Sequence, residues 1–422
     1  MLDVAPFRGV RYAARVVGDL STVTCPPYDV ISPEARSALE GASPYNMVRL
    51  VLGRDEPHDE ADSRKYIRAR DQLERWMREG ALTRDGADSF YVYEQHFSMR
   101  GERRVQRGVL AAVALEDPES GAIVPHERTM PKPVEDRLSL LRATGANLEP
   151  VFAVVAAADD DFAHGMKAPA EAEPAAVFST EEDQVEHRIW VLSDKKKVDG
   201  IRRAASEAIA IIADGHHRYR TALLYRDERR ARDGSGPWDR ILMYLVDAAA
   251  DGPAILPIHR VVSGAHADDA IASLTPAFEV EPAPRDDLEG LAAALRPGRE
   301  GHRQFALVDR DRAWALKLRD AAAERNALPE ARSQAWRDLD VASLHALVFD
   351  RLLSDAKVSF VHSVSEADES VRSGASSMAF LLAPIPFESV RAVALSGEAM
   401  PPKSTYFFPK PRDGVVIRML DG

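Results

Sequence analysis

A run of five residues, Asp214 to Arg218, concentrates side chains that can do chemistry. Asp214 can accept a proton or bind a metal ion, and the neighbouring His216 and His217 can transfer protons. Arg218 carries a planar cationic fork that suits a phosphate, and Gly215 lets the backbone come close to a ligand. These residue types in one run predict a site for a phosphate-bearing ligand.

The elements around this run are expected to hold it in place. Residues 209–213 form an apolar, β-branched stretch that is typical of a buried strand, and Asp214-Gly215 is a turn pair. From Tyr219 onward the apolar spacing is helical. A strand, a tight turn and a helix start would direct backbone N–H groups and the positive end of a helix dipole at one point. The alternative is structural: Asp214 would only cap the helix, and Arg218 would lie on the surface.

Three other segments break their local pattern with polar residues that packing does not require. They are Tyr28-Asp29 in a loop fixed by two prolines, His126-Glu127 before a proline-broken loop, and Lys403-Ser404-Thr405 after another proline pair. A lysine followed by two hydroxyls resembles a phosphate clasp, although the glycine frame of a P-loop is missing. We predict that these segments and the Asp214 run line one cleft.

The composition is that of an ordinary soluble protein. A chain of 422 residues is long enough for two or three domains. The net charge of −12 argues against general binding of nucleic acid. The single cysteine, Cys25, excludes an intrachain disulfide and fits a reducing cytoplasm. We expect no signal peptide and no membrane span, because no apolar run reaches the ~20 residues that a spanning helix needs.

The order of elements predicts an α/β protein with a mixed sheet. We expect strands near 10–17, 20–23, 46–53, 89–97, 105–114, 151–156, 187–192, 238–247, 255–262 and 377–384, helices at 33–40, 59–79, 339–353 and 388–394, and a hairpin at 304–318. Three domain segments are predicted: an α/β core over 1–262, a smaller subdomain over 263–338, and a segment over 339–422 that returns to the core.

Several motifs together resemble an uncharacterised family of bacterial and archaeal proteins, known only as a domain of unknown function. The motifs are P-P-Y-D-V-I at 26–31, N-M-V-R-L at 46–50, E-D-R at 135–137, A-D-G-H-H-R-Y at 213–219, L-P-I-H-R at 256–260 and M-P-P-K-S-T-Y-F-F-P-K at 400–410. The resemblance covers nearly the whole chain, but such a family label names no reaction.

The D-G-H-H-R turn also resembles the nucleotide-binding turn of the ParB/sulfiredoxin-like superfamily, which includes free-serine kinases. This resemblance implies a nucleotide-binding core with large insertions, because a long stretch separates Asp29 from the turn. It implies ATP or ADP as cofactor, with phosphates held by Gly215, His216, His217 and Arg218. In the free-serine kinases an early acid acts as base toward the substrate hydroxyl; here Asp29 or Glu127 could take that part.

The first functional hypothesis is therefore a nucleotide-dependent phosphotransferase, a kinase acting on a small hydroxylated metabolite such as free serine. Phosphoryl transfer needs positioned phosphates, a metal ion and a base. Asp214 is the predicted Mg²⁺ ligand, with Asp29, Glu127, Asp214 and His217 as the catalytic candidates. Lys403, with Ser404 and Thr405 beside it, would neutralise developing charge. The partners are then a nucleotide and a small-molecule substrate.

Two alternatives remain open at this stage. A regulatory protein that binds a nucleotide, or hydrolyses it slowly, would use the same turn without an acceptor pocket. A metal-dependent hydrolase could be built on His126, His216, His217 and His259, but these histidines lack a ligand spacing such as H-x-x-x-H. A sulfiredoxin-like reaction is disfavoured, because His216 stands where a catalytic cysteine is expected.

Overall fold

A computed structural model describes residues 1–56, 59, 64–117, 120–156, 161–167, 172–248 and 252–421 of the chain. The chain forms two compact units: the first joins Met1–Pro253 to Pro409–Gly422, and the second is Ala254–Phe408. The predicted segment ends at residues 262 and 338 both fall inside the second unit. Strands on either side of these positions share one sheet of that unit, so no boundary lies there.

The first unit is built on a mixed sheet, which confirms the predicted fold class. In the described part of the chain its strands follow the order β6-β11-β8-β12-β5-β4-β10-β9, and β1 pairs with β5. They are β1 (Val4–Ala5), β4 (Phe90–Met99), β5 (Glu102–Ala114), β6 (Ile123–Val124), β8 (Val151–Ala156), β9 (Ala176–Thr180), β10 (Val185–Leu192), β11 (Ile209–Asp214) and β12 (Arg240–Asp247). Strand β11 runs parallel to β6 and antiparallel to β8, while β8 and β12 are parallel.

Strand β11 is an inner strand of this sheet, next to the short edge strand β6. Both of its neighbours hold it through backbone hydrogen bonds, and most of its side chains are buried. Ile211 and Ile212 are fully buried. Its register with β8 shifts between Ile212 and Asp214, which re-aims the side chain at the end of the strand. Helix α9 (His216–Asp233) follows after one residue, so the helix begins three residues before the predicted start at Tyr219.

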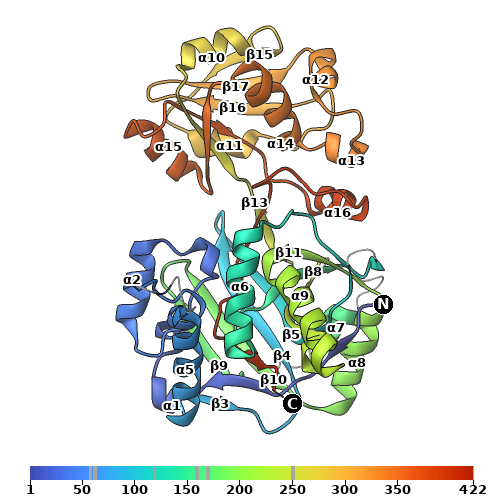
Figure 1. Cartoon of the computed structure of the whole chain (residues 1–422). Helices are drawn as coiled ribbons and strands as arrows, with labels where there is room; N and C mark the ends of the chain where they lie inside the picture. Colours follow the sequence, from blue (N-terminus) through green and yellow to red (C-terminus); the bar gives the residue numbers. More distant parts are fainter. Residues whose placement is uncertain are drawn as a thin grey trace. The chain divides into compact units, whose positions relative to one another are not determined.

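Helices cover this sheet and bring distant segments together. They are α1 (Ala14–Val17), α2 (Pro33–Ala42), α3 (Val48–Val51), α5 (Arg64–Arg78), α6 (Pro131–Thr144), α7 (Asp161–Lys167), α8 (Lys195–Ser206) and α9, with short 3₁₀ turns η1 (Leu20–Thr22), η2 (Tyr28–Val30) and η5 (Pro237–Asp239). Helix α6 lies beside α9, where Leu138 and Leu141 pack on Tyr225 (Figure 1). Burying such a side chain contributes roughly 1.5–3 kcal/mol, so the pair of helices forms a firm base for the turn before α9.

A small second sheet of the first unit joins the N- and C-terminal parts of the chain. It has the order β3-β2-β21-β7. Its strands are β2 (Gly9–Tyr12), β3 (Leu82–Arg84), β7 (Ala146–Asn147) and β21 (Ile417–Met419).

Three predicted N-terminal elements are wrong, and in two of them a local side-chain hydrogen bond favours a turn or a helix over a strand. The strand expected over 10–17 ends at Tyr12, and 20–23 forms the turn η1, where Asp19 accepts a hydrogen bond from Ser21 N at 2.9 Å. The strand expected over 46–53 is helix α3 instead, because Asn46 accepts from Val48 N at 2.9 Å. The predicted start of the helix over 59–79 lies partly outside the described residues, and α5 begins at Arg64.

The second unit holds an antiparallel sheet of order β15-β17-β16-β19-β14-β18. Its elements are β13 (Ala254–Leu256), β14 (His259–Ser263), α10 (Ala267–Leu274), β15 (Phe278–Ala283), α11 (Leu288–Ala294), β16 (Gln304–Val308), β17 (Ala313–Leu318), α12 (Ala321–Ala327), α13 (Gln334–Arg337), α14 (Asp340–Ser343), the π-helix η6 (Leu344–Leu352), β18 (Lys357–Val361), α15 (Val364–Arg372), β19 (Met378–Leu381), α16 (Phe387–Leu395) and β20 (Tyr406–Phe408). The predicted hairpin and the helix after residue 339 are confirmed. The strand expected over 255–262 is divided at Pro257, because proline cannot donate to a ladder, and β13 pairs with β20. None of the helices in the described ranges is long and apolar enough to cross a membrane.

Candidate functional site

The turn between β11 and α9 is shaped by Gly215. Its φ angle is +90°, a left-handed conformation that side chains other than glycine rarely adopt. A Cβ atom at this position would lie 2.9 Å from Arg218 Nε, so glycine is also required for space. The first N–H of the helical ladder is that of Tyr219, which donates to Gly215 O at 2.9 Å. The N–H groups of the preceding helical turn therefore point out of the N-terminus, where an anion is favoured.

Asp214 is held between two cations. Its Oδ1 lies 2.6 Å from Lys410 Nζ, and its Oδ2 lies 2.5 Å from Arg218 Nη2. Burial raises the pKa of Asp214, but Lys410 and Arg218 together hold it well below its ordinary value. The carboxylate is therefore ionised at neutral pH and has both oxygens in ion pairs.

This arrangement does not fit the predicted role of Asp214 as a Mg²⁺ ligand. A ligand oxygen would have to leave a cation to which it is already paired. Across the described ranges, no three His, Cys, Asp or Glu side chains lie close enough to hold a metal ion. The polar run is therefore organised as an ion-pair network.

Arg218 also differs from its predicted role. Besides its contact with Asp214, its Nη1 donates to Pro150 O at 2.5 Å, and the residue is only 7% exposed. Burial lowers the pKa of the guanidinium, but Asp214 and Glu149 more than reverse that effect, so it stays charged. The fork predicted to grip a phosphate is thus used inside the protein, where it fixes Asp214 and the first turn of α9.

Lys410 connects the turn to the proline loop near the N-terminus. Its Nζ lies 3.2 Å from Asp29 Oδ2, in addition to its contact with Asp214. The Asp29 side chain is 41% exposed, so this carboxylate keeps access to solvent. Two of the segments predicted to converge therefore do so, through a lysine that sequence reasoning missed. The sequence did contain a signal for it, because Lys410 is the last residue of the M-P-P-K-S-T-Y-F-F-P-K motif. We interpreted that lysine only as the end of an aromatic strand.

The tyrosine of the same loop is also tied to the network. The Arg137 guanidinium lies 4.1 Å from the centre of the Tyr28 ring, a cation–π contact between the P-P-Y-D and E-D-R motifs. Burial raises the pKa of Tyr28 to about 12, so the phenol remains neutral.

A third predicted segment reaches the turn through histidines. The rings of His126 and His216 meet edge to face with centroids 4.7 Å apart, and His126 N donates to His216 Nε2 at 3.3 Å. Because Nε2 accepts, the proton of the neutral His216 ring lies on Nδ1, which is 3.8 Å from Glu127 Oε2. Burial lowers the pKa of His126 to about 4 and that of His216 well below 6.5. Both rings are therefore neutral at pH 7.

The histidine next to His216 has a structural contact. His217 Nε2 accepts a hydrogen bond from Met130 N at 3.0 Å, which ties the loop after Glu127 to the helix N-terminus. The Glu127 side chain is 43% exposed, so it is the second acid at this turn, after Asp29, that keeps access to solvent.

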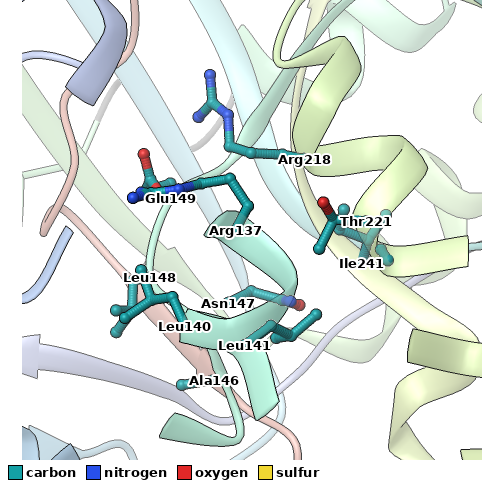
Figure 2. A pocket seen from close by; sticks show the side chains of 11 residues that line it. Arg137, Leu140, Leu141, Ala146, Asn147, Leu148, Glu149, Arg218, Thr221 and Ile241 are labelled. Carbon is teal, nitrogen blue, oxygen red and sulfur yellow. The ribbon is translucent and has the colours of Figure 1, made fainter. Parts of the chain in front are cut away.

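An acid pair lies behind the turn and was not predicted. Figure 2 shows Glu149 and Arg137 side by side at one end of a cavity of about 40 Å³, with leucines at the other end. Arg137 Nη1 donates to Glu149 Oε2 at 3.0 Å. Asp413 is fully buried, and burial together with Glu149 raises its pKa well above the ordinary value. Acids placed next to prolines, as in L-E-P at 148–150, are the sequence signal that could have found Glu149.

With this geometry established, the chain can be compared with known proteins. A family model described as "Protein of unknown function (DUF1015)" matches residues 4–342. The chain belongs to this family. No curated protein matches the sequence.

Several solved structures are similar to this chain at low sequence identity. A free serine kinase in complex with AMP is 15% identical, with 71% of this chain and 88% of that chain covered and a TM-score of 0.36. A conserved hypothetical protein from Pyrococcus furiosus is 15% identical, with 71% and 92% covered and a TM-score of 0.34. A C-terminally truncated SbnI from Staphylococcus aureus is 12% identical, with 72% and 85% covered and a TM-score of 0.35.

Two motifs of the DUF1015 resemblance, L-P-I-H-R and K-S-T, lie in the second unit. Arg260 Nη2 donates to Lys403 O at 3.0 Å, and Ser404 Oγ donates to Pro401 O at 2.5 Å. Lys403 itself has a φ of +55°, which is unusual for a residue with a side chain. That Lys403, Ser404 and Thr405 join the site of the first unit stays a prediction.

Proposed function

We propose that the chain binds a nucleotide by its phosphates at the N-terminus of α9 and transfers a phosphoryl group to a small hydroxylated metabolite, with free serine as one candidate. The observation that carries this proposal is Lys410. Its ammonium group lies between the carboxylates of Asp29 and Asp214, beside the N-terminus of α9. Three segments that are remote in sequence supply an anion-binding helix end, a cation and accessible acids at one place.

The residues of this turn fit a phosphate group. The 18-residue helix α9, which begins directly after Gly215, supplies a dipole of full strength whose positive end favours an anion. Lys410 is closer to Asp214 than to Asp29, so the Asp29 contact is the weaker one. Lys410 can therefore exchange Asp29 for another anion while Asp214 holds it in place.

The exposure of each acid decides the role that we propose for it. Asp214 is buried and paired, so it positions Lys410 rather than accepting a proton. Asp29 and Glu127 keep about two-fifths of their side chains exposed, and either can take a proton from a substrate hydroxyl. Exchange of Lys410 away from Asp29 would leave that carboxylate free to act as base. A bound nucleotide would supply the phosphoryl group; His216 and His217 hold the surrounding loop.

A product screen tests the proposal directly. The full chain is incubated with Mg²⁺, with ATP or ADP, and with a pool of hydroxylated metabolites that includes serine, and phosphorylated products are identified by mass spectrometry. We expect a new phosphate ester that is absent when Lys410→Met replaces the native chain. Nucleotide binding without any product would favour the regulatory alternative. Absence of both binding and product would refute the nucleotide proposal.

A further inference from the structure

A cavity in the second unit is lined by basic side chains and is separate from the nucleotide proposal. Its volume is about 300 Å³, and it lies at the open end of the hairpin β16–β17. Its lining includes the cations Arg296, Arg299, Arg303 and Lys317, together with His302. Such a lining stands out in a protein whose net charge is −12.

The loop that forms one wall is held rigid by nearby acids that point inward. Gly298 N donates to Asp340 Oδ2 at 2.9 Å, and Gly301 N donates to Glu324 Oε2 at 2.6 Å. Between them, Glu300 N donates to an oxygen of Asp338 at 3.1 Å. These hydrogen bonds fix the backbone and use the acids for the loop rather than for the cavity's cations.

Arg303 contacts the carboxylate oxygens of Glu324 and Asp340 that the loop N–H groups leave unused. It is fully buried, and its Nε donates to Glu324 Oε1 at 2.6 Å, with Asp340 Oδ1 3.4 Å from Nη1. Arg303 Nη1 also donates to Asp338 O at 2.7 Å. The charge of Arg303 is therefore balanced within the wall of the cavity.

The outer cations are not balanced in this way. Arg299 and His302 face each other in a tight turn, linked by Arg299 N to His302 O at 3.1 Å and His302 N to Arg299 O at 2.8 Å. Lys317 stands opposite Gln304 in the hairpin. Arg303 forms ion pairs with Glu324 and Asp340. Among the residues that the structure describes, Arg296, Arg299 and Lys317 form no such ion pair.

We propose that this cavity binds a small metabolite that carries a phosphate monoester. The three exposed cations Arg296, Arg299 and Lys317 beside a preformed wall favour a doubly charged anion, and arginine forks match phosphate oxygens. A volume of about 300 Å³ is roughly that of ten water molecules in the liquid, which suits a sugar-sized ligand. Lys317 also has Glu279 opposite it, on the neighbouring strand β15, so Arg299 is the stronger of the two candidates for direct contact.

Titration calorimetry on the full chain tests this site with ribose 5-phosphate as the probe and ribose as its uncharged match. We expect saturable binding of ribose 5-phosphate and none of ribose. The double variant Arg299→Gln/Lys317→Gln should weaken binding at least tenfold. The control is Arg310→Gln, an exposed arginine at the closed end of the same hairpin, roughly 16 Å away along the strand.

Three further arms make the outcome decisive. Inorganic phosphate binding as tightly as ribose 5-phosphate would overturn the metabolite assignment. Equal weakening by the Arg310 control would show non-specific charge attraction and overturn the site. Binding that survives in Lys410→Met supports a second-unit location, whereas binding lost in that variant would place the probe at the first unit and overturn this proposal.

Discussion

Arg218 in the first unit and Arg303 in the second are both buried against acids, and the surroundings of these two arginines differ. In the first unit Arg218 pairs with Asp214, while Asp29 and Glu127 remain accessible nearby. In the second unit Arg303 pairs with Glu324, and the acids of that cluster all point inward. The first region therefore offers carboxylate bases beside a cation, whereas the described lining of the second unit's cavity offers cations and a histidine but no carboxylate.

This difference indicates that proton transfer and anion binding are assigned to different units of the chain. Proton transfer requires a group that can both reach a substrate and change its charge, which Asp29 or Glu127 can do. The cavity of the second unit is lined by arginines and a lysine that can hold an anion, and its described lining residues include no carboxylate. On this account the first unit performs the reaction, and the second unit recognises an anion without transforming it.

The largest effect is expected from removing the two buried arginines. Arg218→Met and Arg303→Met each leave a buried carboxylate without its partner, so each should lower the free energy of unfolding by roughly 3–5 kcal/mol. Chemical denaturation of both variants measures this loss. Only Arg218→Met should also weaken nucleotide binding, because it releases Asp214. If Arg303→Met weakened nucleotide binding as much, the two regions would not be separable.

The next effect concerns pH. His126 has its pKa lowered to about 4 in the folded chain, so the unfolded chain takes up a proton that the folded chain refuses between pH ~6.5 and ~4. Stability should therefore fall by roughly 3 kcal/mol as the pH drops through that window. Urea unfolding at several pH values measures the fall, and His126→Gln should make it shallower. An unchanged pH profile in His126→Gln would show that this ring is not buried in its neutral form.

Two glycines at helix ends provide a smaller, matched comparison. Gly145, at the C-terminal end of α6, has a φ of +57° and a ψ of +31° and open space around it, so Gly145→Ala should cost about 1 kcal/mol. Gly215 lies in the same left-handed region, with a φ of +90° and a ψ of +27°, and Gly215→Ala also displaces the Arg218 guanidinium, so it should cost roughly 2–3 kcal/mol. Thermal melts compare the two. Equal losses would mean that Arg218 adapts freely, which contradicts a rigid turn.

The smallest effect on stability is expected at the accessible acids. Asp29→Asn and Glu127→Gln change exposed groups, so each should shift the free energy of unfolding by less than about 0.5 kcal/mol. The variant that removes the base should still lower the transfer rate by roughly 10²–10⁴-fold. Rates on the product found in the screen, with melts as control, decide which acid it is. If both variants kept the native rate, neither acid would be the base.

The sequence predicted local features of this site well. The strand before Asp214 and the helix after it have clear periodic patterns, and the polar breaks at Asp29 and Glu127 marked segments that do reach the turn. Lys410 was missed as a site residue because its two contacts lie far away in sequence. The same reason hid Glu149 and Asp413, whose properties come from burial rather than from a motif.

Other predictions failed where side chains or prolines decide the backbone. The stretch 46–53 is rich in β-branched and leucine residues, yet the amide of Asn46 starts a helix there. The internal contacts of Arg218 could not be predicted for a related reason: its residue type fits a phosphate, and the carbonyl of Pro150 and the carboxylate of Asp214 also lie within its reach. Residue type states what a group can bind, and packing decides what it does bind.

One measurement tests the central claim that the N-terminus of α9 and Lys410 bind nucleotide phosphates. Titration calorimetry compares ADP with adenosine on the native chain, on Lys410→Met, and on Lys196→Met, an exposed lysine of the same unit. The account predicts that ADP binds at least tenfold more tightly than adenosine, that Lys410→Met removes most of this difference, and that Lys196→Met preserves it. Equal affinities for ADP and adenosine, or a difference that survives in Lys410→Met, would contradict the account.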